Sequence, residues 1–240
     1  MAKLEPYERS LPYSYALGAF PSLQLIAARP EAVRRLLVHP DALESEGVRL
    51  LREKCASLGV REEQAERVLR RESKKGNCFA ALVFDKYEAA LDAQANHVVL
   101  NNISDSGNLG TALRSCLGLG IKNVACIKPC VDIFEPHTVR SSMGAVFSMN
   151  VRVFDTFDDY RQFFPAHTLY PFMLKGSTEL EEAAAQPQKP YSLVFGNEGS
   201  GLPDEFADMG VPVRIPMSSE IDSYNLAISV AIGAYAFTRK

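Results

Sequence analysis

A loop at residues 101–110 gathers residue types that could bind a ligand or assist a reaction. Gly107 and Gly110 permit close approach of the backbone, and Asn108 could cap a helix that carries Arg114 six residues later. Polar groups thus gather at the start of a helix. An ordinary cap with a surface arginine would give the same pattern. A dinucleotide-binding phosphate loop is disfavoured because the complete Gly-x-Gly-x-x-Gly spacing is missing.

Two further loops have unusual compositions. Residues 196–203 contain three glycines in six positions, which a tight turn explains, but a tight turn does not explain Glu198 among them. Residues 214–225 lead into the segment 226–237, which is apolar almost all round and must be enclosed by the fold or by another subunit. Backbone N–H and C=O groups in such loops can recognise an adenine edge or a polar ligand.

The elements that must position these loops alternate between short apolar strands and helices. This alternation predicts an α/β fold with a mostly parallel sheet, in which ligands bind beyond the C-terminal ends of the strands. Each of the three loops directly follows a predicted strand. Strands are predicted at 97–100, 124–128, 151–154, 169–174, 192–195 and 213–215, helices at 109–119 and 226–237, and a further segment at 139–147.

A smaller α/β unit is predicted before residue 95. Helices are predicted at 22–28, 41–58 and 62–71, strands at 33–38 and 78–84, and a linker with a helix over 85–95. The densest positive cluster of the chain is either a solvated helix end or an exposed basic edge. It consists of Arg67, Arg70, Arg71, Lys74 and Lys75.

The composition of the chain excludes several classes of protein. With 47% hydrophobic and 23% charged residues, the chain fits neither a disordered nor a fibrous protein. The longest apolar run, 226–237, is far short of the ~20 residues that a membrane span needs, so no membrane partner is expected. The N-terminus lacks an apolar signal region, which favours the cytoplasm. Five cysteines without a Cys-x-x-Cys pair and four scattered histidines are interpreted as structural residues, and no metal site is expected.

Three segments, in their order and spacing, resemble the signature motifs of the SpoU (TrmH-type) RNA methyltransferases. The first is Asn108-Leu109-Gly110 with Arg114, the second is 195–202, and the third is Ile215-Pro216-Met217 followed by 223–226. The segment 139–147 is similar to the stretch between the family's first two motifs. The resemblance therefore covers about residues 96–240, and three ordered motifs are far more specific than any one alone.

The resemblance implies a fold and a reaction. The fold would be an α/β domain over 96–240 whose C-terminal segment passes through a loop to form a deep trefoil knot, an exception to the usual absence of knots. Residues 1–95 are similar in layout to an L30e-like RNA-binding domain with an N-terminal extension. The implied activity is methyl transfer from S-adenosylmethionine to a ribose 2′-hydroxyl of ribosomal or transfer RNA by a homodimer.

The family's site residues can be carried over to matching positions. Asn108, Arg114, Glu198 and Asn225 would form the catalytic cluster. Two departures bear on the site: Tyr224 stands where the family usually has leucine, and Ser106-Gly107 replaces the usual proline after the first-motif aspartate. The cofactor pocket would be lined by Leu174, Gly196, Ile215, Ser223 and Tyr224, with Ser223 also supporting the catalytic cluster.

The residue types fit this chemistry. Methyl transfer from a sulfonium is an in-line displacement that needs an aligned hydroxyl and a route for its proton. Because a guanidinium stays protonated in proteins, Arg114 is interpreted as binding the adjacent phosphate and polarising the hydroxyl. A non-catalytic RNA-binding protein on the same fold is the main alternative, although it would be expected to have lost Arg114 or Asn225. A Rossmann-type oxidoreductase is a weaker alternative, since its phosphate loop is missing.

Overall fold

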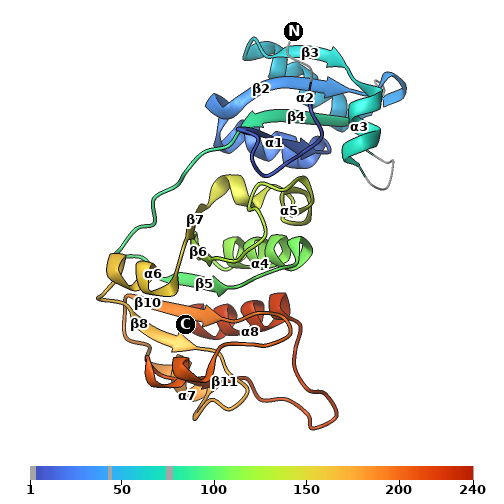
Figure 1. Cartoon of the computed structure of the whole chain (residues 1–240). Coiled ribbons are helices and arrows are strands. Elements are labelled where there is room, and N and C mark those ends of the chain that lie inside the picture. The colour runs from blue at the N-terminus through green and yellow to red at the C-terminus, as the bar shows by residue number, and fades with distance from the viewer. Residues whose placement is uncertain (1–3, 43–44, 74–77, 240) are drawn as a thin grey trace. The chain divides into compact units, whose positions relative to one another are not determined.

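The computed structural model describes residues 4–42, 45–73 and 78–239 and divides into two compact units (Figure 1). The first unit comprises Met1–Tyr87 and Asp132–Ser148, and the second comprises Glu88–Val131 and Met149–Lys240. The chain therefore leaves the second unit after β6 (Asn123–Ile127) and returns to it before β7 (Asn150–Phe154). The predicted catalytic domain over 96–240 was treated as continuous, whereas the structure assigns its segment Asp132–Ser148 to the first unit.

The first unit is built on a four-stranded sheet in the order β1-β4-β2-β3. Strand β4 runs antiparallel to β1 and β2, while β2 and β3 are parallel. The strands are β1 (Tyr13–Leu17), β2 (Val33–Val38), β3 (Arg61–Gln64) and β4 (Ala80–Asp85), and the helices are α1 (Ala19–Ala28), α2 (Glu46–Ser57) and α3 (Glu66–Glu72).

Three features of the first 96 residues differ from the sequence predictions. The predicted helix at 62–71 is a strand followed by a helix, because pairing with β2 draws the polar stretch Arg61–Gln64 into the sheet as its edge strand. Strand β1 was not predicted. No helix forms within 86–96.

The segment Asp132–Ser148 completes the core of the first unit. It carries α5 (Pro136–Ser141) and a 3₁₀ turn at Ala145–Ser148. The ring of Phe84 on β4 meets Phe134 and Phe147 of this segment, with ring centroids 5.6 and 5.1 Å apart. The buried hydroxyl of Ser14 donates to the carbonyl oxygen of Phe134 at 2.5 Å. A stretch that follows β6 of the second unit thus packs as part of the first.

The second unit contains a five-stranded sheet in the order β7-β6-β5-β10-β8, and every neighbouring pair is parallel. The predicted parallel α/β fold is confirmed. The strands are β5 (His97–Asn101), β6 (Asn123–Ile127), β7 (Asn150–Phe154), β8 (Thr168–Pro171) and β10 (Tyr191–Phe195), with a small parallel pair β9 (Thr178–Glu179) and β11 (Val213–Arg214); the helices are α4 (Ser106–Gly118), α6 (Phe157–Phe163), α7 (Leu180–Ala185) and α8 (Leu226–Thr238).

The central strands of this sheet are buried on both faces. All residues of β6 and β10 are buried, as expected for parallel strands covered by helices. Helix α8, predicted to be enclosed, packs against α4 and buries the face that contains Val230 and Phe237. Its other face leaves Ile228 and Tyr235 each 48% exposed. Among the described residues, no helix has the length and apolar character needed to span a bilayer.

Candidate functional site

The parallel sheet brings two of the three chemically rich loops to one edge. Leu100 of β5 pairs in register with Phe195 of β10, so the loops that follow these neighbouring strands start side by side. The third loop ends at Asn225, the N-cap of α8, and α8 packs against α4, the helix that follows β5. Segments about a hundred residues apart therefore meet beyond the carboxyl ends of the strands.

Glu198 is held in place by hydrogen bonds from the loop that follows β5. Its Oε2 accepts from the N–H of Ser104 at 3.3 Å and from the Ser104 hydroxyl at 3.0 Å. Its Oε1 accepts from the N–H of Asp105 at 3.1 Å and from Nδ2 of Asn108 at 3.3 Å. Partial burial acts to raise the pKa of this carboxyl, but hydrogen bonds from its own N–H and from Asp105, Ser104 and Asn108 outweigh it and lower the pKa below its ordinary value. The Glu198 side chain therefore stays ionised, and its hydrogen bonds hold the loop that follows β10 against the loop that follows β5.

Asn108 links Glu198 to Asn225. The N–H of Asn108 donates to the Asp105 side chain, which caps α4, while its Oδ1 accepts from Nδ2 of Asn225 at 2.9 Å. Oδ1 of Asn225 in turn accepts from the N–H of Ala227 at 2.9 Å and caps α8. We call the hydrogen-bonded series Glu198, Asn108 and Asn225 the polar chain. It unites one residue from each of the three motifs.

Arg114 lies apart from the polar chain. It is exposed on α4, and its side chain makes no hydrogen bond or ion pair with any residue that the structure describes. Six positions separate it from Asn108, which at ~100° per residue turns the two side chains to different faces of the helix. The structure thus connects three of the four predicted catalytic residues and leaves Arg114 available as an exposed cation.

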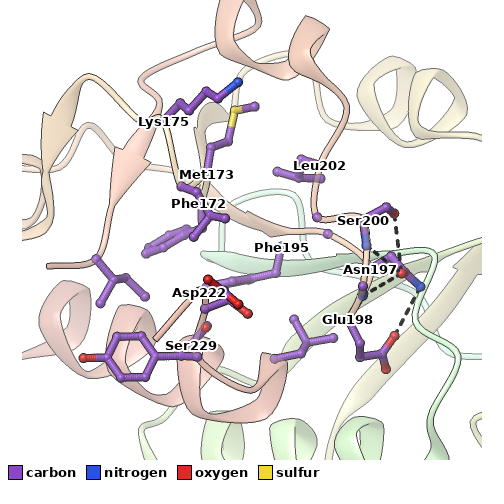
Figure 2. A pocket seen from close by; sticks show the side chains of 18 of the residues that line it. Phe172, Met173, Lys175, Phe195, Asn197, Glu198, Ser200, Leu202, Asp222 and Ser229 are labelled. Carbon is purple, nitrogen blue, oxygen red and sulfur yellow. Dashed lines mark hydrogen bonds between the residues drawn. The ribbon is translucent and has the colours of Figure 1, made fainter. Parts of the chain in front are cut away.

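A pocket of about 420 Å³ lies beside the polar chain (Figure 2). The rings of Phe172 and Phe195 stack in its wall, with centroids 4.3 Å apart and planes inclined by 21°. Helix α8 approaches this pair closely at Gly233, where an added Cβ would lie 2.7 Å from the Phe172 ring. All five residues predicted to bind a cofactor line the pocket, namely Leu174, Gly196, Ile215, Ser223 and Tyr224.

The glycine loop after β10 forms a tight turn. The N–H of Asn197 donates to the carbonyl of Gly201 at 3.1 Å, and the N–H of Gly201 donates back at 3.0 Å. Gly201 has a φ of +68°, and a Cβ on Gly196 would lie 2.1 Å from the carbonyl carbon of Gly201. The glycines of this loop therefore serve two purposes: Gly201 adopts a left-handed backbone, and Gly196 allows a close approach between two parts of the same loop.

The sequence did not single out several other residues that line the pocket. Lys175 and Asp222 are adjacent in the sequence to Leu174 and Ser223, which were predicted to bind the cofactor. That adjacency was the only signal in the sequence that these two charged residues line the pocket. The stacking of Phe172 on Phe195 depends on the alignment of β8 with β10, which a sequence pattern does not give. Within the described part of the chain, no group of three or more His, Cys, Asp or Glu side chains is placed to hold a metal ion.

Comparison with known proteins shows that the chain is similar to RNA methyltransferases. The chain is 27% identical over 144 residues, 60% of its length and 53% of the relative's, to an uncharacterised tRNA/rRNA methyltransferase from Synechocystis. It is 29% identical over 142 residues, 58% of its length and 52% of the relative's, to a 23S rRNA (adenosine(1067)-2′-O)-methyltransferase from Streptomyces azureus. The chain therefore spans about half the length of these curated relatives.

Solved structures agree with the fold. The crystal structure of the SpoU methyltransferase AviRb from Streptomyces viridochromogenes, in complex with the cofactor AdoMet, superposes with a TM-score of 0.82. The superposition covers 95% of this chain and 90% of that one at 22% sequence identity, so it supports the fold. The model of the SpoU rRNA methylase family matches residues 95–235, which contain all three motifs, the polar chain and the pocket. By this match and by its fold, the chain belongs to the SpoU rRNA methylase family.

Proposed function

We propose that the chain is an S-adenosylmethionine-dependent methyltransferase that acts on a ribose 2′-hydroxyl in ribosomal or transfer RNA. The observation that carries this proposal is the placement of the polar chain Glu198–Asn108–Asn225 beside a pocket lined by every residue predicted to bind the cofactor. Membership of the SpoU family and the names of the curated relatives support it.

The pocket suits the proposed cofactor. Its volume of about 420 Å³ falls within the ~300–1,000 Å³ usual for small-molecule sites. The stacked Phe172 and Phe195 and the nearby Ile215 offer an apolar wall for an adenine ring, while the backbone of the glycine loop offers polar groups. When bound, S-adenosylmethionine supplies a methyl group on a positively charged sulfur.

The residues of the chain would position and polarise the substrate. Asn108 and Asn225 fix the starts of two helices, so the pocket and the loop after β5 are held together. Glu198 stabilises the same arrangement as a carboxylate. Arg114, exposed and without a partner among the described residues, is suited to bind an RNA phosphate and polarise the adjacent hydroxyl. The proton would then leave through the phosphate or water.

Three further features complete the proposal. The chain would work as a homodimer that covers the exposed Ile228 and Tyr235 of α8. Residues 1–95, which contain the N-terminal part of the first unit, would form an L30e-like RNA-binding domain, and the catalytic domain would contain the trefoil knot that the resemblance implies. In the positive cluster of this RNA-binding domain, Arg70 forms an ion pair with Glu66 and Arg71 forms one with Glu72. Lys74 and Lys75 of the same cluster lie outside the described residues.

The experiment uses radiolabelled S-adenosylmethionine and RNA from a strain that lacks this protein. We expect label to enter the RNA at a 2′-O-methylated ribose with the wild-type chain, and transfer to be lost with Arg114→Ala while cofactor binding persists. Because Arg114 is exposed, its removal should change stability by less than about 0.5 kcal/mol. Cofactor binding without transfer to any RNA fraction would favour the non-catalytic RNA-binding alternative.

A further inference from the structure

The pocket contains four charged side chains, and they differ in whether they have partners. Glu198 accepts hydrogen bonds from Ser104, Asp105 and Asn108, and a further one from Nδ2 of Asn197 at 3.2 Å. Lys175, Asp204 and Asp222 are exposed, and their side chains make no hydrogen bond or ion pair with the described residues. These three charges are therefore available to a ligand.

The available charges match those of the proposed cofactor. S-adenosylmethionine carries a sulfonium, an ammonium and a carboxylate, so it bears one net positive charge. The three pocket side chains without partners, which leave out Glu198, are two carboxylates and one ammonium and together bear one net negative charge. After methyl transfer the sulfur becomes a neutral thioether, and the product S-adenosylhomocysteine has no net charge. A carboxylate near the sulfur would distinguish the two molecules, whereas an apolar wall would not.

Asp222 is better placed for this role than Asp204. It lies three residues before Asn225, the end of the polar chain, where the proposed reaction would occur. Asp204 instead follows the glycine loop at the start of a 3₁₀ turn. Figure 2 shows Asp222 near Ser229 of α8, with Lys175 on the opposite side of the pocket. The two side chains form no ion pair with each other, so each can act on a different part of one ligand.

We propose that Asp222 makes the pocket selective for S-adenosylmethionine over S-adenosylhomocysteine, and that Lys175 binds the carboxylate that both molecules carry. This inference rests on the proposed function. Weaker retention of the product would favour its release, a step that limits turnover in many enzymes.

Calorimetric titration of both molecules tests the inference on the full chain. Asp222→Asn keeps the size of the side chain and should weaken S-adenosylmethionine binding about three- to tenfold, with S-adenosylhomocysteine affected less than about twofold. Lys175→Met should weaken both to a similar extent. Glu220→Gln is the matched control, because Glu220 is exposed in the same loop but does not line the pocket. Raising NaCl from about 0.05 to about 0.5 M should shrink the wild-type preference.

The outcomes separate this inference from the proposed function. If the wild-type chain binds neither molecule, the proposed cofactor is wrong. If it binds both and Asp222→Asn leaves their affinity ratio unchanged, the cofactor stands and the role of Asp222 is overturned. An equal change of that ratio in Glu220→Gln would also overturn it, because the selectivity would then come from the general charge of the loop.

Discussion

The side-chain amide of Asn225 donates to Oδ1 of Asn108 at 2.9 Å and joins two residues that lie 117 positions apart. Both residues also belong to helix starts, since Asn108 donates its N–H to the cap of α4 and Asn225 is the cap of α8. One hydrogen bond therefore aligns the start of α4 with the start of α8. Through Asn108 the alignment extends to Glu198 and the glycine loop.

Two substitutions at Asn225 should separate its two roles. Asn225→Ala removes both the cap and the contact with Asn108, and should lower the free energy of unfolding by about 1–2 kcal/mol. Asn225→Asp keeps an oxygen for the N–H of Ala227 but cannot donate to Asn108, so it should retain most of the stability and lose methyl transfer. Urea unfolding and transfer assays check this. Wild-type transfer in Asn225→Asp would contradict a role for the contact.

The lowered pKa of Glu198 predicts loss of stability in acid. A carboxyl whose pKa is lower in the folded state adds stability that is present above its unfolded pKa and is lost as the pH falls through the folded pKa. We expect the free energy of unfolding to fall below about pH 4.5, and Glu198→Gln to make that fall shallower. Ser104→Ala, which removes one donor, should have a partial effect. Identical slopes for wild type and Glu198→Gln, in urea unfolding at pH 3–5, would refute the prediction.

A second acid-sensitive group lies in the core of the second unit. His97 is fully buried, donates from Nε2 to the carbonyl of Asp92 at 2.9 Å, and accepts from the Tyr160 hydroxyl at Nδ1 at 2.8 Å. Burial lowers the pKa of His97 to about 4, with hydrogen bonding to Asp92 acting in the opposite direction. In the unfolded chain His97 is therefore protonated below about pH 6.5, whereas in the folded chain it stays neutral down to about pH 4. Stability should decline through this window, by up to about 3 kcal/mol.

Urea unfolding from pH 7 to pH 4 measures this decline, and the imidazole resonances of His97 give an independent readout. The resonances should not titrate above about pH 5. Titration near the usual value for histidine would show that the ring is accessible to water and that the buried arrangement is wrong.

Two glycines of one loop should respond differently to alanine. At Gly196 an added Cβ would lie 2.1 Å from the backbone of Gly201, so Gly196→Ala must displace the turn and should lower the melting temperature and abolish cofactor binding. At Gly199 the nearest atom to an added Cβ is Oδ1 of Asn197 at 3.5 Å, an ordinary contact. Gly199→Ala is thus the control and should bind the cofactor normally. Equal behaviour of the two variants in thermal unfolding and titration would contradict the geometry of the loop.

The fold of the second unit could be predicted well because its central strands are short apolar runs buried on both faces. Strand β10, predicted at 192–195, differs from the structure by one residue. Helix α6 was missed although its sequence carries two helix signals: Thr156 and Asp159 form a capping box, and the aromatic residues Phe157, Tyr160 and Phe164 recur at helical spacing on its buried side. In the first unit, Arg61–Gln64 reads as polar helix and becomes an edge strand through pairing with β2.

The candidate site was predictable to the extent that its residues lie in ordered motifs. Glu198 was singled out because a turn alone did not explain a carboxylate among glycines, and the structure shows that it fastens two loops. The hydrogen bond between Asn108 and Asn225 could not be derived, because it depends on how α8 packs against α4. The charged residues Lys175 and Asp222 belong to no motif, so the sequence did not predict that they line the pocket.

The excursion of Asp132–Ser148 into the first unit has a consequence for how the two units can be exchanged between relatives. The boundary between them is crossed three times, at 87–88, 131–132 and 148–149. Deleting the N-terminal segment alone would leave Phe134 and Phe147 without the Phe84 ring that they pack against. A chimera that replaces the first unit must therefore transplant the internal segment together with the N-terminal one, so the two units are not independent modules joined by a single linker.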